Sequence, residues 1–170
     1  MEGSVSLGSR QVGSHHVDRA LAQRAIALAL PLIDNAMRDP QHGDSGFLHI
    51  VVMDPALGPD HCSFEDAILH EHSVGDRSKW DADYAMYARA KTAVAWRHRA
   101  DSHAVQALRP HVLRSGDTTL WGSVFMDGIV VGASGAFPAF DEMYSTVVAG
   151  CLRALAKQAA EKCAATAFLP

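Results

Sequence analysis

Two apolar runs separated by Asp127-Gly128 constrain the fold of this chain more than any other feature of its sequence. The runs cover residues 120–126 and 129–134. Asp-Gly readily adopts the positive backbone angles of a two-residue turn, so the runs that flank it pair as neighbouring antiparallel strands. The sequence therefore predicts a β-hairpin.

A helix and two further strands are expected before this hairpin. Apolar residues recur every three or four positions from Val17 to Ala36, which is typical of one helix face. Ser14 or Asp18 lies near the expected start, and Pro31 is a possible kink. Residues 47–53 (FLHIVVM) are rich in β-branched side chains and predict a strand, with a second strand expected within residues 62–72.

Helices are also expected on both sides of the hairpin. Residues 80–99 combine aromatic side chains with an alanine-rich face, and a short helix follows from Asp101 or Ser102 to Arg109. Pro138 opens a last helix that continues to about Cys163. This order predicts an α+β fold in which helices cover an antiparallel sheet. We expect residues 1–16, which are polar and rich in Gly and Ser, to be a flexible leader before one domain at 17–170.

Composition excludes several classes of partner. The chain has 170 residues and a formal charge of -4, so it lacks the basic surface that nucleic-acid binding requires. It contains no run of about 18 apolar residues and no apolar signal-peptide core near its start. Three widely spaced cysteines do not form a disulfide framework. We therefore expect a cytoplasmic protein that binds neither nucleic acid nor a membrane.

Several motifs together resemble the GlcG/HbpS family over roughly residues 18–160. The matching segments are Ile50-Val51-Val52-Met53-Asp54 with Leu57-Gly58, Ala90-Lys91-Thr92-Ala93, Trp121-Gly122, Val131-Gly132-Ala133-Ser134-Gly135 and Asp141-Glu142. The chain is also similar to the C-terminal domain of PduO-type corrinoid adenosyltransferases. The resemblance implies a profilin-like α/β/α sandwich on a five-stranded antiparallel sheet, assembly into homo-oligomers, and haem or another tetrapyrrole as the candidate cofactor.

Lys91 is the first residue that suggests chemistry. It shares a helical face with Tyr84, Tyr87 and His98. A buried lysine has a lowered pKa, so its amine can bind a carboxylate, act as a base or form a Schiff base. The alternative is a lysine whose stem lines the edge of the core while its charge stays in water.

The corner after the hairpin is a second candidate site. Ser134 and Gly135 end a strand shortly before a helix whose first turn holds Asp141 and Glu142. Backbone N–H groups near a helix N-terminus can cradle an anion. The alternative is that the glycines permit a tight corner and close packing.

Histidines provide the remaining candidates. His70 and His72 share one face of a strand with Glu71 on the other, and His61 precedes them, a set that can bind Zn or Fe but that also suits a solvated strand end. His98 and His103 are candidate axial haem ligands, with surface or capping roles as the alternative. We found no signature of a metalloprotease, nucleotide-binding loop or nucleophile elbow.

The leading hypothesis is a small-molecule binding protein that holds haem or another flat anionic ligand between the Lys91 helix and the Ser134-Gly135 corner. The residues expected to bind the ligand are Tyr84, Tyr87, Lys91, His98, His103, Trp121, Ser134, Gly135 and Asp141. The alternative is a cofactor-independent enzyme acting on a small organic acid or aromatic compound. In that enzyme Lys91 fixes or deprotonates the substrate and Glu71, His98 or Glu142 transfers a proton. A structural oligomer without a ligand is the third hypothesis.

Overall fold

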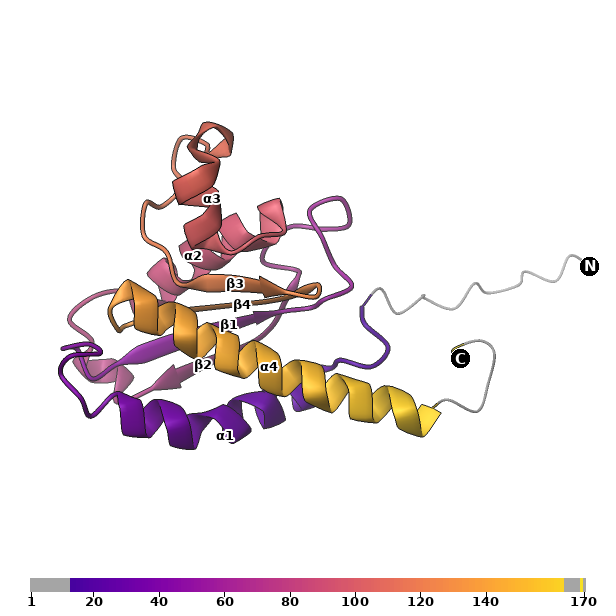
Figure 1. Ribbon diagram of the computed structural model, residues 1–170. Coiled ribbons are helices and arrows are strands. Elements are labelled where there is room, and N and C mark those ends of the chain that lie inside the picture. Colours follow the sequence, from indigo (N-terminus) through magenta and orange to yellow (C-terminus); the bar gives the residue numbers. More distant parts are fainter. Residues whose placement is uncertain (1–12, 164–168, 170) are drawn as a thin grey trace, which may run out of the picture.

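The computed structural model describes residues 13–163 and residue 169 (Figure 1). Its helices and strands follow one another in the order α1 (Arg19–Ala36), β1 (Leu48–Met53), β2 (Ile68–Val74), η1 (Arg77–Lys79), α2 (Tyr84–His98), α3 (Ser102–Leu108), η2 (Pro110–Val112), β3 (Ser123–Met126), β4 (Ile129–Ser134) and α4 (Pro138–Cys163).

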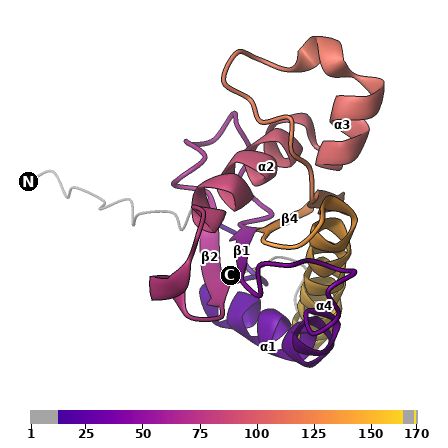
Figure 2. The same ribbon diagram turned by 90° about the vertical axis from the view of Figure 1, so that its left-hand side faces the viewer.

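The fold has three layers. The strands form one antiparallel sheet in the order β2-β1-β4-β3. Helices α1 and α4 cover one face, and α2 covers the other with α3 beyond it (Figures 1 and 2). The predicted α+β class and the hairpin at Asp127-Gly128 are confirmed. Within the described residues the sheet has four strands, and not the five that the family resemblance implied.

Local interactions explain where the elements depart from expectation. Strand β3 begins only at Ser123, because residues 113–122 form an irregular connection after η2. Helix α2 begins at Tyr84, because the Asp83 carboxylate accepts a hydrogen bond from the Met86 N–H and caps the helix there. Strand β2 runs from Ile68 to Val74, since residues 64–67 form turns before it. Helix α1 contains Pro31 and is capped by Asp18.

The start of the described chain is attached to the body of the fold. The Ser14 N–H donates to both carboxylate oxygens of Asp54, at 3.1 and 3.2 Å. Val17 is buried at the edge of the core. Residues 1–12 of the expected leader lie outside the described residues. Between residues 13 and 163, none of the helices has both the length and the apolar character that a membrane crossing requires.

Strand β1 is the centre of the core and is buried along its whole length. Side chains alternate between the two faces of a strand. Leu48, Ile50 and Val52 therefore pack into the apolar cluster beneath α1 and α4. Val51 and Met53 pack into the second cluster, beneath α2. His49 lies on this second face, so a polar side chain interrupts an otherwise apolar strand.

Helix α2 approaches strand β4 very closely at Gly132. A Cβ atom at this position would overlap the side chain of Thr92, which is itself fully buried and donates its hydroxyl to the Ala88 carbonyl. Only glycine therefore permits this distance between helix and sheet.

We expect Gly132→Ala to lower the free energy of unfolding by about 1–3 kcal/mol, because Thr92 and the backbone of α2 must move away from the sheet. Urea denaturation measures this change. Gly150→Ala is the matched control, since position 150 lies on α4 with open space around it and alanine favours a helix by up to about 1 kcal/mol. Equal destabilisation by the two substitutions would contradict the proposed close approach.

Candidate functional site

A cleft of about 420 Å³ opens where the β1–β2 edge of the sheet meets the start of α2. Its lining residues come from β1, β2, η1 and α2 and are His49, Glu71, Ser73, Arg77, Asp83, Ala85, Met86 and Arg89. The register pairs His49 with Ser73, and Val51 with Glu71. Because side chains alternate along strands, His49, Glu71 and Ser73 all lie on the face that α2 covers.

His49 joins these side chains in one hydrogen-bonded network. Its Nδ1 lies 2.8 Å from Ser73 Oγ, and its Nε2 lies 3.0 Å from Glu71 Oε1. Arg89 on α2 donates to both oxygens of the same carboxylate, at 2.7 and 2.5 Å. The imidazole is buried with 3% of its surface exposed, so both ring nitrogens find protein partners in place of water.

The charges of the network follow from its contacts. Hydrogen bonds from Arg89 and His49 lower the pKa of Glu71 to about 2, despite partial burial, so this carboxylate is ionised at neutral pH. An ionised carboxylate only accepts hydrogen bonds, so Nε2 of His49 carries the proton. Burial lowers the pKa of His49 more than Glu71 raises it. The ring is therefore neutral at pH 7, and its Nδ1 lone pair accepts the Ser73 hydroxyl.

The rim of the cleft carries a second arginine. The Arg77 guanidinium lies 4.8 Å from the centre of the Trp80 ring, in a cation–π contact. Trp80 in turn packs edge-on against His49, with ring centres 5.8 Å apart. Arg77 thus lines the cleft while its guanidinium packs on Trp80, whereas the Arg89 guanidinium is bound by Glu71.

Lys91 meets Ser134 and Asp141 in a different, closed site. Its Nζ lies 2.7 Å from Asp141 Oδ2, 3.1 Å from Ser134 Oγ and 3.3 Å from the Ala133 carbonyl oxygen. Asp141 Oδ1 also accepts the Ala136 N–H at 2.9 Å. The protein's own carboxylate therefore occupies the corner that the sequence suggested as an anion cradle. The cavity beside Gly135 and Ala136 has only about 10 Å³, less than a ligand needs.

Burial dominates the electrostatics of this second site. Both side chains are almost completely buried. Removal from water raises the pKa of Asp141 to about 6, although Lys91 and backbone N–H groups act in the opposite direction. The ion pair thus joins α2 to the start of α4, and a structural role accounts for its contacts.

The other predicted ligand residues line neither the His49 cleft nor the cavity beside Gly135. The Tyr84 hydroxyl donates to Asp81 at 2.6 Å, and Tyr87 is half-buried on α2. His103 stacks on Trp121 with ring centres 3.9 Å apart. His103 also lines a shallow cleft of about 290 Å³ with Asp101 and Glu142.

The two histidines expected as haem ligands, His98 and His103, have different surroundings. The His98 Nε2 accepts a hydrogen bond from Arg97 Nε at 3.3 Å, and burial together with Arg97 lowers the pKa of His98. His103 shares its cleft with the carboxyl groups of Asp101 and Glu142. Both ring nitrogens of His49 are already engaged.

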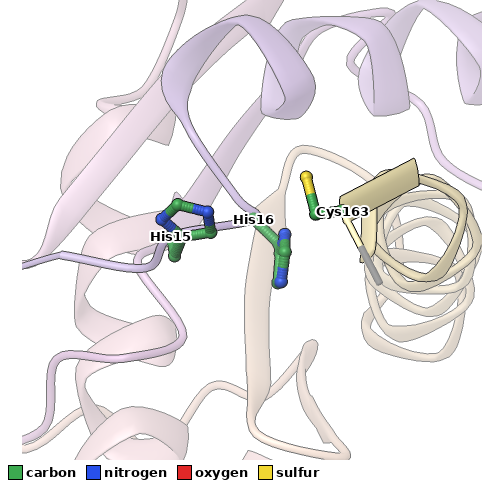
Figure 3. A group of neighbouring side chains, drawn as sticks. All are labelled: His15, His16 and Cys163. Carbon is green, nitrogen blue, oxygen red and sulfur yellow. The ribbon is translucent and has the colours of Figure 1, made fainter. Parts of the chain in front are cut away.

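Metal ligands converge at one place in the described chain. Figure 3 shows His15 and His16, which precede α1, beside Cys163 at the end of α4. One ligand atom from each lies within 4.8 Å of the others, a nitrogen and sulfur set that suits Zn²⁺. The group is exposed or half-exposed and does not line the His49 cleft. His61, His70 and His72 form no such group among residues 13–163.

Four residues of this cleft were not expected from the sequence, namely His49, Ser73, Arg77 and Arg89. One signal was present, because a histidine within the apolar run FLHIVVM requires a buried polar partner. Alternation along β2 also places Glu71 and Ser73 on a common face. The pairing register, which sequence does not provide, was needed to bring them to His49.

Comparison of the chain with protein-family models, with curated proteins and with solved structures finds no match.

We expect Lys91→Met to lower the free energy of unfolding by about 3–5 kcal/mol at pH 8, because it leaves the Asp141 carboxylate buried and unpaired. Urea denaturation of the variant and of a Lys157→Met control, which replaces an exposed lysine of helix α4, measures the loss.

The loss should depend on pH. The Asp141 pKa is raised from its ordinary value of 3.8 to about 6, so the folded state holds this proton more tightly than the unfolded chain. The stabilisation that this tighter proton binding gives the folded state is fully present below about pH 4 and is lost as pH rises to about 6. Removal of Lys91 raises the Asp141 pKa further, because Lys91 lowers it in the native protein. The loss of unfolding free energy in Lys91→Met should therefore be smaller at pH 5 than at pH 8. A deficit that grows as pH falls would contradict this account.

Proposed function

We propose that this protein binds a small organic acid in the cleft formed by β1, β2, η1 and α2. The observation that carries the proposal is the convergence of a buried neutral imidazole, a hydroxyl and an arginine on one cleft of about 420 Å³. This volume lies within the range of about 300–1,000 Å³ that is usual for small-molecule sites.

Arg77 indicates which chemical group the cleft accepts. Its guanidinium carbon lies over the Trp80 ring, and a cation–π contact does not use the N–H donors that a ligand would need. A planar guanidinium matches a carboxylate with two parallel hydrogen bonds. Arg89 is not equivalent, because both of its contacts go to Glu71.

The remaining lining residues suggest the rest of the ligand. The Ser73 hydroxyl oxygen can accept a hydrogen bond from a ligand, while Ala85 and Met86 provide an apolar wall on α2. A compact acid with one polar substituent and a short apolar part would satisfy these surfaces. This proposal keeps the expected small-molecule function and moves its site away from Lys91.

A domain of the GlcG/HbpS type remains part of the proposal. The three-layer arrangement and the meeting of Lys91 with Ser134 and Asp141 support it. Assembly into homo-oligomers and a cytoplasmic location remain predictions of the sequence.

Titration of isotope-labelled protein with lactate, benzoate and phenylacetate, followed by amide NMR, tests the cleft. We expect saturable shifts at Ser73, Arg77 and Arg89, and about tenfold weaker binding in Arg77→Ala because a carboxylate contact is lost. Lys79→Ala is the matched control, since Lys79 is an exposed cation of the same η1 turn that does not line the cleft. Equal weakening in both variants, or shifts located elsewhere, would overturn the proposal.

Haem binding is tested separately by titration with haemin and measurement of Soret absorbance. We expect no saturable shift, and equal weak changes in wild type, His98→Ala and His103→Ala, because the cleft at His103 holds only about 290 Å³ and the His98 Nε2 already accepts a hydrogen bond from Arg97. A stoichiometric shift that one variant abolishes would favour the haem hypothesis over a small organic acid.

A further inference from the structure

Ser73 has the environment of a nucleophile. Its hydroxyl donates to Nδ1 of His49 at 2.8 Å, and Ser73 also lines the cleft. The hydroxyl proton is therefore directed at a base, while the oxygen belongs to the surface that a ligand would contact. Hydrogen-bond contact between a hydroxyl and a basic imidazole is the geometry that activates serine for attack on a carbonyl carbon.

The partners of His49 define its tautomer. Glu71 accepts the Nε2 proton, which leaves a lone pair on Nδ1 toward Ser73. Three groups thus stand in the relation of nucleophile, base and orienting carboxylate that serine hydrolases use. In the usual triad Nε2 of the histidine faces the serine and Nδ1 faces the carboxylate, whereas here Nδ1 faces Ser73 and Nε2 faces Glu71. Either nitrogen can accept a proton when the other donates to a carboxylate.

Arg89 explains why the carboxylate keeps its position. It holds both oxygens of Glu71 from helix α2, so the orienting group is fixed from the opposite side of the cleft. A histidine that only filled the core would need a single acceptor for its N–H. Here a neutral base, a fixed carboxylate and an accessible hydroxyl occur together at the wall of a cleft.

We propose that Ser73 is a catalytic nucleophile activated by His49, and that the cleft hydrolyses small esters of carboxylic acids. This inference rests on the proposed function, because the acid released by hydrolysis is the ligand class that the cleft is expected to bind. Arg77 lines the same cleft and supplies the positive charge that the developing oxyanion requires.

The reaction balances with water as the second substrate. Ser73 Oγ forms a bond to the ester carbonyl carbon while its proton passes to Nδ1 of His49. The tetrahedral intermediate collapses, the bond to the alcohol oxygen breaks, and the alcohol takes the proton from His49. Water then attacks the acyl group on Ser73 with His49 as base, releasing the carboxylic acid and restoring the serine hydroxyl.

Labelling with a fluorophosphonate, followed by intact mass and peptide mapping, tests the nucleophile directly. We expect one adduct on Ser73 in the full chain, none in Ser73→Ala, and slower labelling in His49→Gln. Ser78→Ala is the matched control, because Ser78 is an exposed serine of the neighbouring η1 turn that bonds to Asp76 and lines no part of the cleft. An adduct on another serine, or none, would overturn the proposal.

Hydrolysis of p-nitrophenyl acetate provides the activity readout. The rate should fall on the order of a hundredfold or more in Ser73→Ala and change little in Ser78→Ala. Fluorophosphonate mapping is needed beside it, because ten histidines and three cysteines can hydrolyse an activated ester without a site. Unchanged hydrolysis in Ser73→Ala would argue against the proposal.

The pH profile separates a base from a structural histidine. His49 faces Glu71 from β2, Arg77 from η1 and Arg89 from α2, and burial lowers its pKa below 6.5. The value of kcat/KM should therefore rise with pH to a plateau that begins below neutrality. A profile that continues to rise into alkaline pH would indicate hydroxide or lysine attack and would count against His49.

A second variant covers the case in which a substitution perturbs folding. Ser73→Cys preserves the side-chain size and should be alkylated by iodoacetamide faster than Cys62, whose thiol pKa is raised. Slow alkylation at position 73 would contradict activation by His49. Carboxylate binding in the cleft without any Ser73 adduct would refute only the nucleophile, whereas failure of both would refute the proposed function as well.

Discussion

The close contact between helix α2 and strand β4 determines the rest of this structure. Gly132 lets Thr92 lie directly against the sheet, and this contact sets the distance between helix α2 and the sheet. Lys91, one residue earlier on α2, then reaches Asp141 and Ser134. Arg89, two residues further toward the start of the helix, reaches Glu71 on β2. The close packing of α2 on β4 thus places both Lys91 and Arg89 within reach of their carboxylate partners.

These two networks use similar ion pairs but differ in their surroundings. The Lys91–Asp141 pair is closed off from water, so desolvation raises the pKa of the carboxyl to about 6. The Arg89–Glu71 pair borders a cleft and makes bidentate contact, so hydrogen bonding lowers the pKa of the carboxyl to about 2. The closed pair links α2 to the first turn of α4. The open pair orients a histidine whose other nitrogen faces Ser73, and this makes it the better candidate for chemistry.

Several parts of the fold could be predicted because they depend on neighbours in sequence. The hairpin follows from Asp127-Gly128, and the last helix from Pro138 and the apolar spacing after it. Residues that depend on distant partners were harder to assign. Glu71 was proposed as a proton-transfer group in an enzyme centred on Lys91, and the structure places it beside His49, whose role in an apolar strand had no local explanation. The number of strands was also misjudged, because the family resemblance implied a fifth that residues 13–163 do not form.

The sequence by itself determined the class of fold, the positions of most helices and strands, and the convergence of a lysine with the corner after β4. The tertiary structure alone decided that Asp141 fills that corner and that His49, Glu71 and Ser73 meet on another face. The physical reason is register. Cross-strand pairing joins residues more than twenty positions apart, and a shift of one residue would turn each side chain to the opposite face of the sheet.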